Sequence, residues 1–272
     1  MTRPILTLLC VACLLASVAR ADDAPEAAKS EELAKKLNNP VAALISVPFQ
    51  QNVDYRIGAN NDGVIYKLNI QPVIPIKLND EWNLISRTIL PVVHWNKDVV
   101  PSEGTRFGLS DTTQSFFFSP AEPSTWGQMI WGFGPALLLP TATEGALGSQ
   151  KWGAGPTVVL LKQSGPVTAG FLANQIWSFA GNDNRKRVNQ TFFQPFLSYT
   201  THTATSLIVN LESSYDWTTA DWTIPANFMV QQVFKIGPQI MAGQIGFRSY
   251  LDAPPNGPSW GLRASLIFLF PK

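Results

Sequence analysis

The sequence predicts an all-β fold: an antiparallel up-and-down transmembrane β-barrel of about 12 strands, preceded by a short helix. Three observations lead to this prediction. The 272-residue chain is 45% hydrophobic but only 14% charged, whereas a soluble domain carries about 25% charged residues. Beyond the N-terminal region, no stretch reaches the roughly 20 consecutive apolar residues of a membrane-spanning helix. Repeated segments instead alternate between apolar and polar positions, as strands do.

The first 21 residues have the pattern of a secretory signal peptide. Arg3 precedes an apolar run over residues 5–18, and Ala19-Arg20-Ala21 is a small-residue cleavage site. Both cysteines, Cys10 and Cys13, lie in this segment, so the exported chain is expected to have no disulfide. A lipoprotein signal is the less favoured alternative, because no good lipobox precedes either cysteine. We therefore expect three parts: a signal peptide over 1–21, a leader helix over 22–40 and a barrel over 41–272.

The leader differs in composition from the rest of the chain. Residues 26–37 are rich in Ala, Glu, Lys and Leu, with Ser30 available as an N-cap and Asn38-Asn39-Pro40 ending the helix. Two interpretations are open. The helix plugs the mouth of the barrel from the periplasmic side, with Leu33 and Leu37 docked inside, or it is a frayed leader in water, since isolated helices this short are marginal.

Twelve segments of the remaining chain have strand character, and short turns between them alternate with longer polar loops. This is the organisation of bacterial outer-membrane barrels, which have short periplasmic turns and long external loops. The alternation of side chains is clear in 63–77, 205–217 and 259–270 and poor in 236–250. The predicted strands are 43–53, 63–77, 82–95, 106–118, 125–139, 151–162, 166–180, 189–201, 205–217, 222–234, 236–250 and 259–270.

Tryptophans support a membrane environment, whereas prolines complicate the strand assignment. Eight of the nine Trp fall near predicted strand ends, which indicates two interfacial girdles, and a soluble sandwich or lipocalin-like barrel is the alternative. The girdle residues are Trp82 and Trp126 on the periplasmic side, and Trp95, Trp152, Trp177, Trp217, Trp222 and Trp260 on the outer side; Trp131 is expected in mid-strand. Prolines cannot donate to a strand ladder, yet seven fall in predicted strands: Pro72, Pro75, Pro91, Pro135, Pro156, Pro195 and Pro225.

If the apolar face of each strand meets lipid, the polar face lines the lumen. Opposite charges then share one interior, and two interpretations are equally open: a partly ion-paired lining around a narrow solute path, or buried charges that only make the barrel rigid. Arg248 belongs to a strand that alternates poorly, as does Asp111. The predicted lumen-lining residues are Lys67, Arg87, Asp111, Gln128, Gln194, Asn210, Glu212, Asn227, Gln231 and Arg263.

Four blocks of sequence carry a resemblance to a known family. In this order along nearly the whole exported chain, residues 32–50, 85–91, 107–120 and 268–272 resemble the bacterial family named for the MetA pathway of phenol degradation. The resemblance implies an outer-membrane β-barrel of transporter type. The association with phenol and other aromatic compounds implies a hydrophobic small-molecule cargo. It implies no catalytic residues.

We therefore expect an outer-membrane channel or transporter through which small, hydrophobic or aromatic molecules diffuse passively. The alternative is a structural or surface-interaction barrel without flux. Expected partners are the solute, membrane lipid, lipopolysaccharide and the barrel assembly machinery. The basic run over residues 185–187 is either a site for the phosphates of lipopolysaccharide or simply a solvated loop. The net charge of +1 gives no field for nucleic acid.

An enzyme is not expected, and neither is a cofactor. A hydrolytic triad needs a histidine beside a serine, but only His94 and His202 are present, and the sequence has no G-x-S-x-G motif. A structural role at the membrane interface is the simpler interpretation of His94. No metal site is expected, because two distant histidines without cysteine do not make a ligand set.

Overall fold

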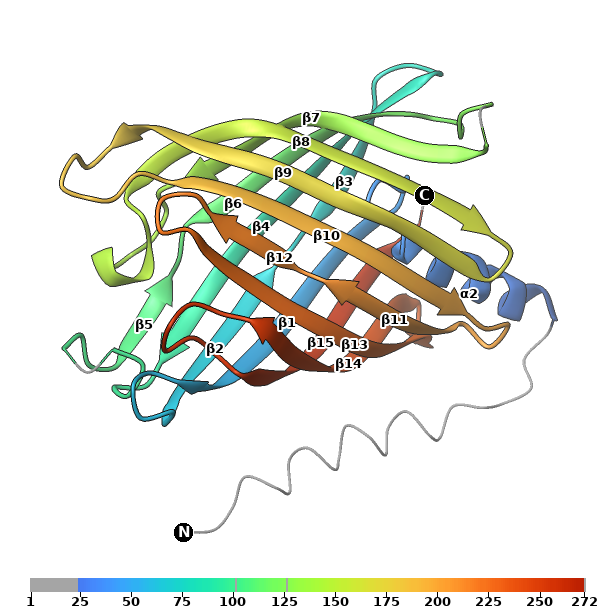
Figure 1. The fold of residues 1–272 in the computed structure, drawn as a ribbon. Coiled ribbons are helices and arrows are strands. Elements are labelled where there is room, and N and C mark those ends of the chain that lie inside the picture. Colours follow the sequence, from blue (N-terminus) through green and yellow to red (C-terminus); the bar gives the residue numbers. More distant parts are fainter. Residues whose placement is uncertain (1–23, 101, 126, 272) are drawn as a thin grey trace, which may run out of the picture.

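The structure is a computed structural model that describes residues 24–100, 102–125 and 127–271. The predicted signal peptide and Trp126 lie outside the described residues and stay predictions. The described chain forms a single sheet closed on itself, an antiparallel barrel of 12 strands (Figure 1). The predicted fold class is confirmed.

Three of the twelve strands are interrupted by one or two residues, and each of these consists of two segments. The uninterrupted strands are β1 (Ile45–Ile57), β4 (Trp82–Trp95), β7 (Met129–Leu139), β8 (Lys151–Ser164), β9 (Val167–Gly181), β10 (Asn189–Thr200), β13 (Asp221–Ile236), β14 (Gln239–Asp252) and β15 (Trp260–Phe270). The interrupted strands are β2 (Gly63–Ile70) with β3 (Val73–Lys77), β5 (Arg106–Leu109) with β6 (Thr112–Pro120), and β11 (Thr205–Leu211) with β12 (Ser213–Asp216). A short 3₁₀ helix, η1 (Gly145–Leu147), lies in the loop before β8.

Successive strands pair with each other, and the last strand closes the barrel against the first. The β1–β15 pairing keeps one register from Ile45 opposite Phe270 to Tyr55 opposite Trp260. Short turns gather at the end that holds the N-terminal helix, and long loops gather at the opposite end (Figure 1). By the convention of outer-membrane barrels, we call these the periplasmic end and the outer end.

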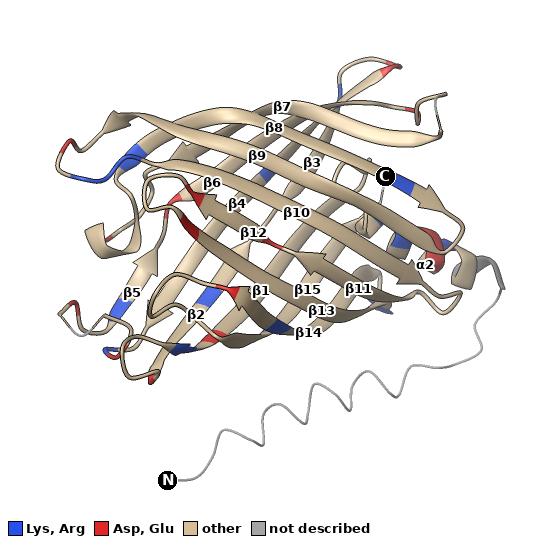
Figure 2. Ribbon diagram, viewed as in Figure 1, with Lys and Arg blue, Asp and Glu red and all other residues tan. Residues whose placement is uncertain are grey.

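The outer wall is apolar and the inner wall carries polar groups. On β13 the exposed Phe228 and Val230 alternate with Asn227, Met229 and Gln231, which are at most 5% exposed. Figure 2 shows charged residues mainly in the loops, the turns and the helix, with few on the bodies of the strands. This is the alternation that a barrel in lipid requires, and it accounts for the low charged fraction of the chain.

The structure corrects the placement of Trp131. A strand over 125–139 would place it in the middle, but β7 begins at Met129, so Trp131 lies near the periplasmic end and its ring centroid is 5.7 Å from that of Trp82. At the outer end, Trp217 and Trp222 both contact Tyr215, with centroids 4.8 Å apart. Aromatic rings therefore gather at both ends of the wall, where a bilayer has its interfaces.

Most of the strand prolines lie where the ladder is irregular. Pro72 falls in the gap between β2 and β3, and Pro225 lies at a register shift between β13 and β14. Pro135 and Pro156 face each other across β7 and β8, and the pairing of β8 with β9 skips Pro156. A residue without an N–H is tolerated at such positions. Pro195, by contrast, sits in the regular pairing of β10 with β9.

The leader forms helix α2 (Ala24–Leu37). Ser30 lies in its interior, so the predicted N-cap role of Ser30 is wrong. The predicted end is confirmed: the helix stops at Leu37, and the backbone N–H of Asn38 donates to the carbonyl of Lys35 at 3.2 Å. Within the described ranges, no helix has the length and apolar character to cross a membrane.

Candidate functional site

A cluster of buried charges lies on the inner wall of the barrel. Both oxygens of Glu212 accept from Arg263, at 2.8 Å each, and Oε2 also accepts from Arg248 at 3.3 Å. Arg248 Nε donates to Asp54 at 3.1 Å. Asn52 Oδ1 accepts from Arg263 at 2.7 Å and from Arg248 at 3.0 Å. These five residues are called the ion-pair cluster; its two carboxylates balance its two guanidinium groups.

The backbone of three adjacent strands positions this cluster. Asp54 on β1 lies opposite Gly261 on β15, which lies opposite Arg248 on β14. A Cβ atom on Gly261 would come within 2.4 Å of Asp54 Oδ1, so the glycine leaves room for the carboxylate that Arg248 binds. Glu212 comes from the gap between β11 and β12, and its N–H donates to the carbonyl of Pro225 at 3.1 Å.

Sequence patterning did not assign Asn52 and Asp54 to the lumen. The expected strand ended at residue 53, which placed Asp54 in a loop, whereas β1 continues to Ile57. The alternation of polar Gln50, Asn52 and Asp54 with residues of the other face is the signal that identifies them.

The structure places eight of the ten predicted lumen residues on the inner wall. Asn210 and Asn227 are joined by a 2.7 Å hydrogen bond, and Gln231 is 2% exposed. Lys67 lies between Asn52 and Val93 in the register, on the face that these buried residues share. The eight are Lys67, Arg87, Gln194, Asn210, Glu212, Asn227, Gln231 and Arg263.

The structure contradicts the other two assignments. Gln128 is exposed in the turn before β7 with a φ of 56°, because the strand starts later than expected. Asp111 lies in the gap between β5 and β6, and its carboxylate accepts from the N–H and hydroxyl of Ser149, both at 2.6 Å. Asp111 therefore holds the loop before β8 instead of lining the lumen.

Two further cations lie on the inner wall without a matching carboxylate. Among the described residues, neither Lys67 nor Arg87 forms an ion pair. The one side-chain bond of Arg87 in the described chain goes to the amide oxygen of Gln71, at 3.3 Å. Because the ion-pair cluster is internally balanced, these two residues leave the middle of the lumen with an excess of positive charge.

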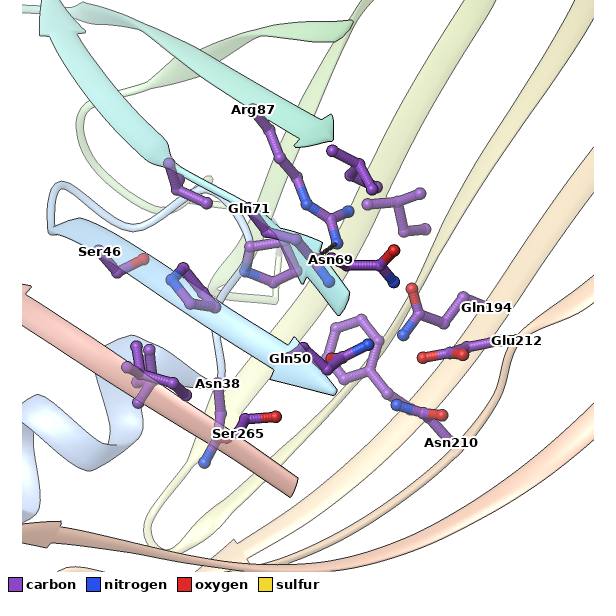
Figure 3. A pocket seen from close by; sticks show the side chains of 18 of the residues that line it. Asn38, Ser46, Gln50, Asn69, Gln71, Arg87, Gln194, Asn210, Glu212 and Ser265 are labelled. Carbon is purple, nitrogen blue, oxygen red and sulfur yellow. Dashed lines mark hydrogen bonds between the residues drawn. The ribbon is translucent and has the colours of Figure 1, made fainter. Parts of the chain in front are cut away.

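A cavity of about 420 Å³ lies in the barrel between the leader and the ion-pair cluster. Asn38 and Leu37 line one side of it, and Glu212 and Arg263 line the other. Figure 3 shows Arg87, Gln194 and other polar side chains converging on this space from several strands. The polar groups are interspersed with apolar ones, which include Ile89, Leu172, Ile176, Phe192, Phe196 and Ile208.

Helix α2 is docked in the periplasmic end of the barrel. Leu33 is 5% exposed and packs with Leu44, Val233 and Ile267, and Leu37 lies against the same group. The loop after the helix is also anchored, since Asn38 Nδ2 donates to Ser206 Oγ at 3.1 Å. The leader of this structure is thus packed against the barrel interior, as the plug interpretation expects.

One side-chain hydrogen bond joins the helix to the turn between β10 and β11. Glu31 contacts His202 Nδ1 at 2.9 Å and Lys35 Nζ at 2.7 Å. Hydrogen bonds from Lys35 and then from His202 lower the pKa of the Glu31 carboxyl below its ordinary value of 4.5. The contact with Lys35 lies within the helix, whereas the contact of the carboxylate with His202 favours the docked helix.

Neither histidine hydrogen-bonds to a serine among the described residues. The ring of His94 lies 5.8 Å from that of Tyr66 and 6.3 Å from that of Phe107, both exposed on the outer wall. His202 is in the periplasmic turn with Glu31. In the described part of the chain, no group of three His, Cys, Asp or Glu residues is arranged to hold a metal ion.

The closed 12-strand barrel and its partly filled lumen define the class of this protein, an outer-membrane-type β-barrel. The structure of the COG4313 outer membrane channel from Pseudomonas putida F1 matches it with a TM-score of 0.63, at 18% sequence identity, over 84% of this chain and 94% of that chain. This likeness shows the shared fold.

Other comparisons are more distant. Outer membrane phospholipase A from Escherichia coli matches with a TM-score of 0.47 and 11% identity, over 90% of this chain and 98% of that chain. The Salmonella typhi phospholipase matches at 0.44 and 10%, over 83% and 91%. These scores are too low to carry an argument about activity. No family model matches the chain, and no curated protein sequence matches it.

Proposed function

We propose that this protein is an outer-membrane channel through which small molecules diffuse passively, without catalysis. The observation that carries the proposal is the 420 Å³ cavity, lined by both polar and apolar side chains, inside a closed barrel. Ligand sites commonly combine apolar walls with a few polar groups that orient the ligand. The barrel fold shared with an outer membrane channel supports the same role.

In this proposal helix α2 is a plug that limits flux. The helix and the residues after it contribute Lys36, Leu37, Asn38 and Asn39 to the cavity wall. A solute that moves from the cavity to the periplasmic end has to pass this segment, so its displacement opens the path. The polar contacts of Asn38 and Glu31 hold the leader to the barrel at a few points, so that its displacement stays local.

The proposed cargo is a small molecule with an apolar or aromatic body. Phe192 and Phe196 face the cavity, beside Ile89 and Ile208, and the resemblance to the phenol-degradation family points to the same class. We also propose that the protein is a member of that family and that its signal peptide directs its export. Lipopolysaccharide and the barrel assembly machinery are the proposed partners.

A second candidate function is a structural or surface-interaction barrel without flux. The ion-pair cluster favours it, because Glu212, Arg248 and Arg263 satisfy one another across the interior. Such a network makes a barrel rigid whether or not solute passes.

Liposome swelling separates these functions. The full exported chain and a chain lacking 22–39 are reconstituted at equal density and tested with neutral solutes of increasing size. We expect slow swelling with the full chain and faster swelling after the deletion. Equal rates would remove the plug role from the leader. Absence of flux for every solute with both chains, while heat-modified mobility in gels shows folded barrels, would refute the channel and favour the structural role.

A further inference from the structure

We propose that the cavity binds organic anions, with Arg87 as the group that receives the carboxylate or similar acidic end. The inference rests on the proposed channel function and names the charge of its solute. Some charged groups on the cavity wall already have partners within the protein, and others do not.

The carboxylate on the cavity wall is not available to a ligand. Both oxygens of Glu212 accept from guanidinium groups at 2.8 Å, and Oε2 accepts a further bond from Arg248. Arg263, the other partner in this arrangement, is likewise occupied. Lys36 lines the cavity at the leader and pairs with Glu32 at 2.7 Å. These groups therefore contribute little net charge to the cavity.

Arg87 is different, because its guanidinium reaches the cavity with one hydrogen bond, to Gln71. Figure 3 shows its side chain directed into the space that Asn69 and Gln194 also border. An arginine presents a planar set of N–H donors that suits a carboxylate, which it binds in a bidentate way. Lys67, also without an ion pair in the described chain, raises the positive potential on the same wall.

The wall also offers unused hydrogen-bonding capacity. Within the described chain, Nε2 of Gln231 and Oδ1 of Asn69 are buried without a hydrogen-bond partner, and both residues line the cavity. A buried polar atom left unpaired costs free energy that a ligand recovers when it supplies the partner. Nε2 of Gln231 is a donor and suits the acidic end of the ligand, whereas Oδ1 of Asn69 is an acceptor and would take a donor from water or from another part of the ligand.

The apolar side of the cavity determines the rest of the ligand. Ile89 follows Arg87 on the inner face of β4, and Phe192 and Phe196 line the same cavity from β10. A body of aromatic or branched hydrocarbon fits this wall, while chloride or phosphate uses none of it. The chemical class is therefore a small organic acid in its anionic form.

Equilibrium dialysis of the folded, detergent-solubilised chain tests the inference with benzoate and its neutral isostere benzamide at pH 7. We expect benzoate to bind more tightly than benzamide. Arg87→Gln should weaken benzoate binding about tenfold or more and leave benzamide binding unchanged, whereas Arg87→Lys should restore part of the loss. Arg56→Gln, at an exposed position of β1, is the matched control.

Three outcomes would overturn the inference: equal binding of both probes, unchanged benzoate binding in Arg87→Gln, or competition by chloride at the concentrations at which benzoate binds. If Arg87→Gln does not fold, Gln71→Ala tests the inference instead. This change removes the hydrogen-bond partner of the Arg87 guanidinium, so the preference for benzoate over benzamide should be maintained or increased. A loss of that preference counts against the proposal. Flux of the two probes into liposomes is measured separately: benzoate binding without any flux refutes the channel and not the anion site.

Discussion

Glu212 is the residue whose loss should most weaken the folded barrel. The change Glu212→Gln keeps the size of the side chain but removes its charge, so Arg248 keeps the carboxylate of Asp54 while Arg263 loses its ion pair in the described chain. Removing one partner of a buried ion pair costs about 3–5 kcal/mol. Because the Glu212 side chain is 22% exposed to the cavity, water replaces part of the lost interaction. We therefore expect the lower end, about 3 kcal/mol, or roughly a hundredfold in the unfolding equilibrium.

Unfolding by guanidinium in lipid vesicles, followed by tryptophan fluorescence, measures this change. Glu122→Gln is the matched control, since Glu122 is exposed in the turn before β7 and its change should stay within about 0.5 kcal/mol. The double variant with Arg263→Gln should be less destabilised than the sum of the single variants, because one charge pair is lost twice in that sum. An effect of Glu212→Gln no larger than the control would refute the view that the cluster holds the barrel together.

Three further predictions concern the leader and the closure of the barrel. Leu33→Ala should weaken the docking of helix α2 by about 2 kcal/mol and speed hydrogen exchange in 24–37. The change Lys29→Ala, at an exposed position, should do neither, and equal exchange in both variants would contradict the docking. Lys35 of the same helix and then His202 of the barrel lower the folded pKa of the Glu31 carboxyl, so the contribution of the His202 contact to docking is complete above the unfolded value of 4.5 and declines as pH falls through the folded value. The protection factors of the helix amides, which are exchange rates corrected for their intrinsic pH dependence, should therefore fall on acidification below 4.5, and a profile that Glu31→Gln leaves unaltered would disprove the link. Gly261→Ala should cost about 1–3 kcal/mol in guanidinium unfolding, because its Cβ meets Asp54 Oδ1 at 2.4 Å; wild-type stability would show that this space is not needed.

The barrel could be predicted from the sequence because a strand in lipid has to alternate, and the clear alternation of β2, β11 and β15 follows this rule. The same rule accounts for the eight residues whose side chains lie on the inner wall. It fails where a strand is interrupted or its start is obscured. Asp111 lies in such a gap, and Gln128 directly precedes the apolar residues Met129 to Trp131, so the pattern extends the strand over it.

The contacts between strands could not be predicted in the same way. Nothing local in the sequence indicates that Asn52 and Arg263 are in register, since the first and last strands meet only when the barrel closes. The docking of the leader depends equally on distant residues: the pocket for Leu33 is built from Leu44, Val233 and Ile267. A periodic pattern identifies the face of a residue, but the partner on that face depends on the register.

The position of the ion-pair cluster has a consequence for assembly. Three of its bonds reach Asn52 and Asp54 on β1 and link positions 194, 196 and 211 residues apart in the chain, across the seam between β1 and β15. In an open, unfinished sheet the carboxylate of Asp54 would face the interior without Arg248, a state that low dielectric makes costly. Every one of these bonds becomes available in the step that joins the two ends of the sheet. Closure of the seam thus completes the ion-pair cluster, and half-closed forms gain nothing from its bonds to β1.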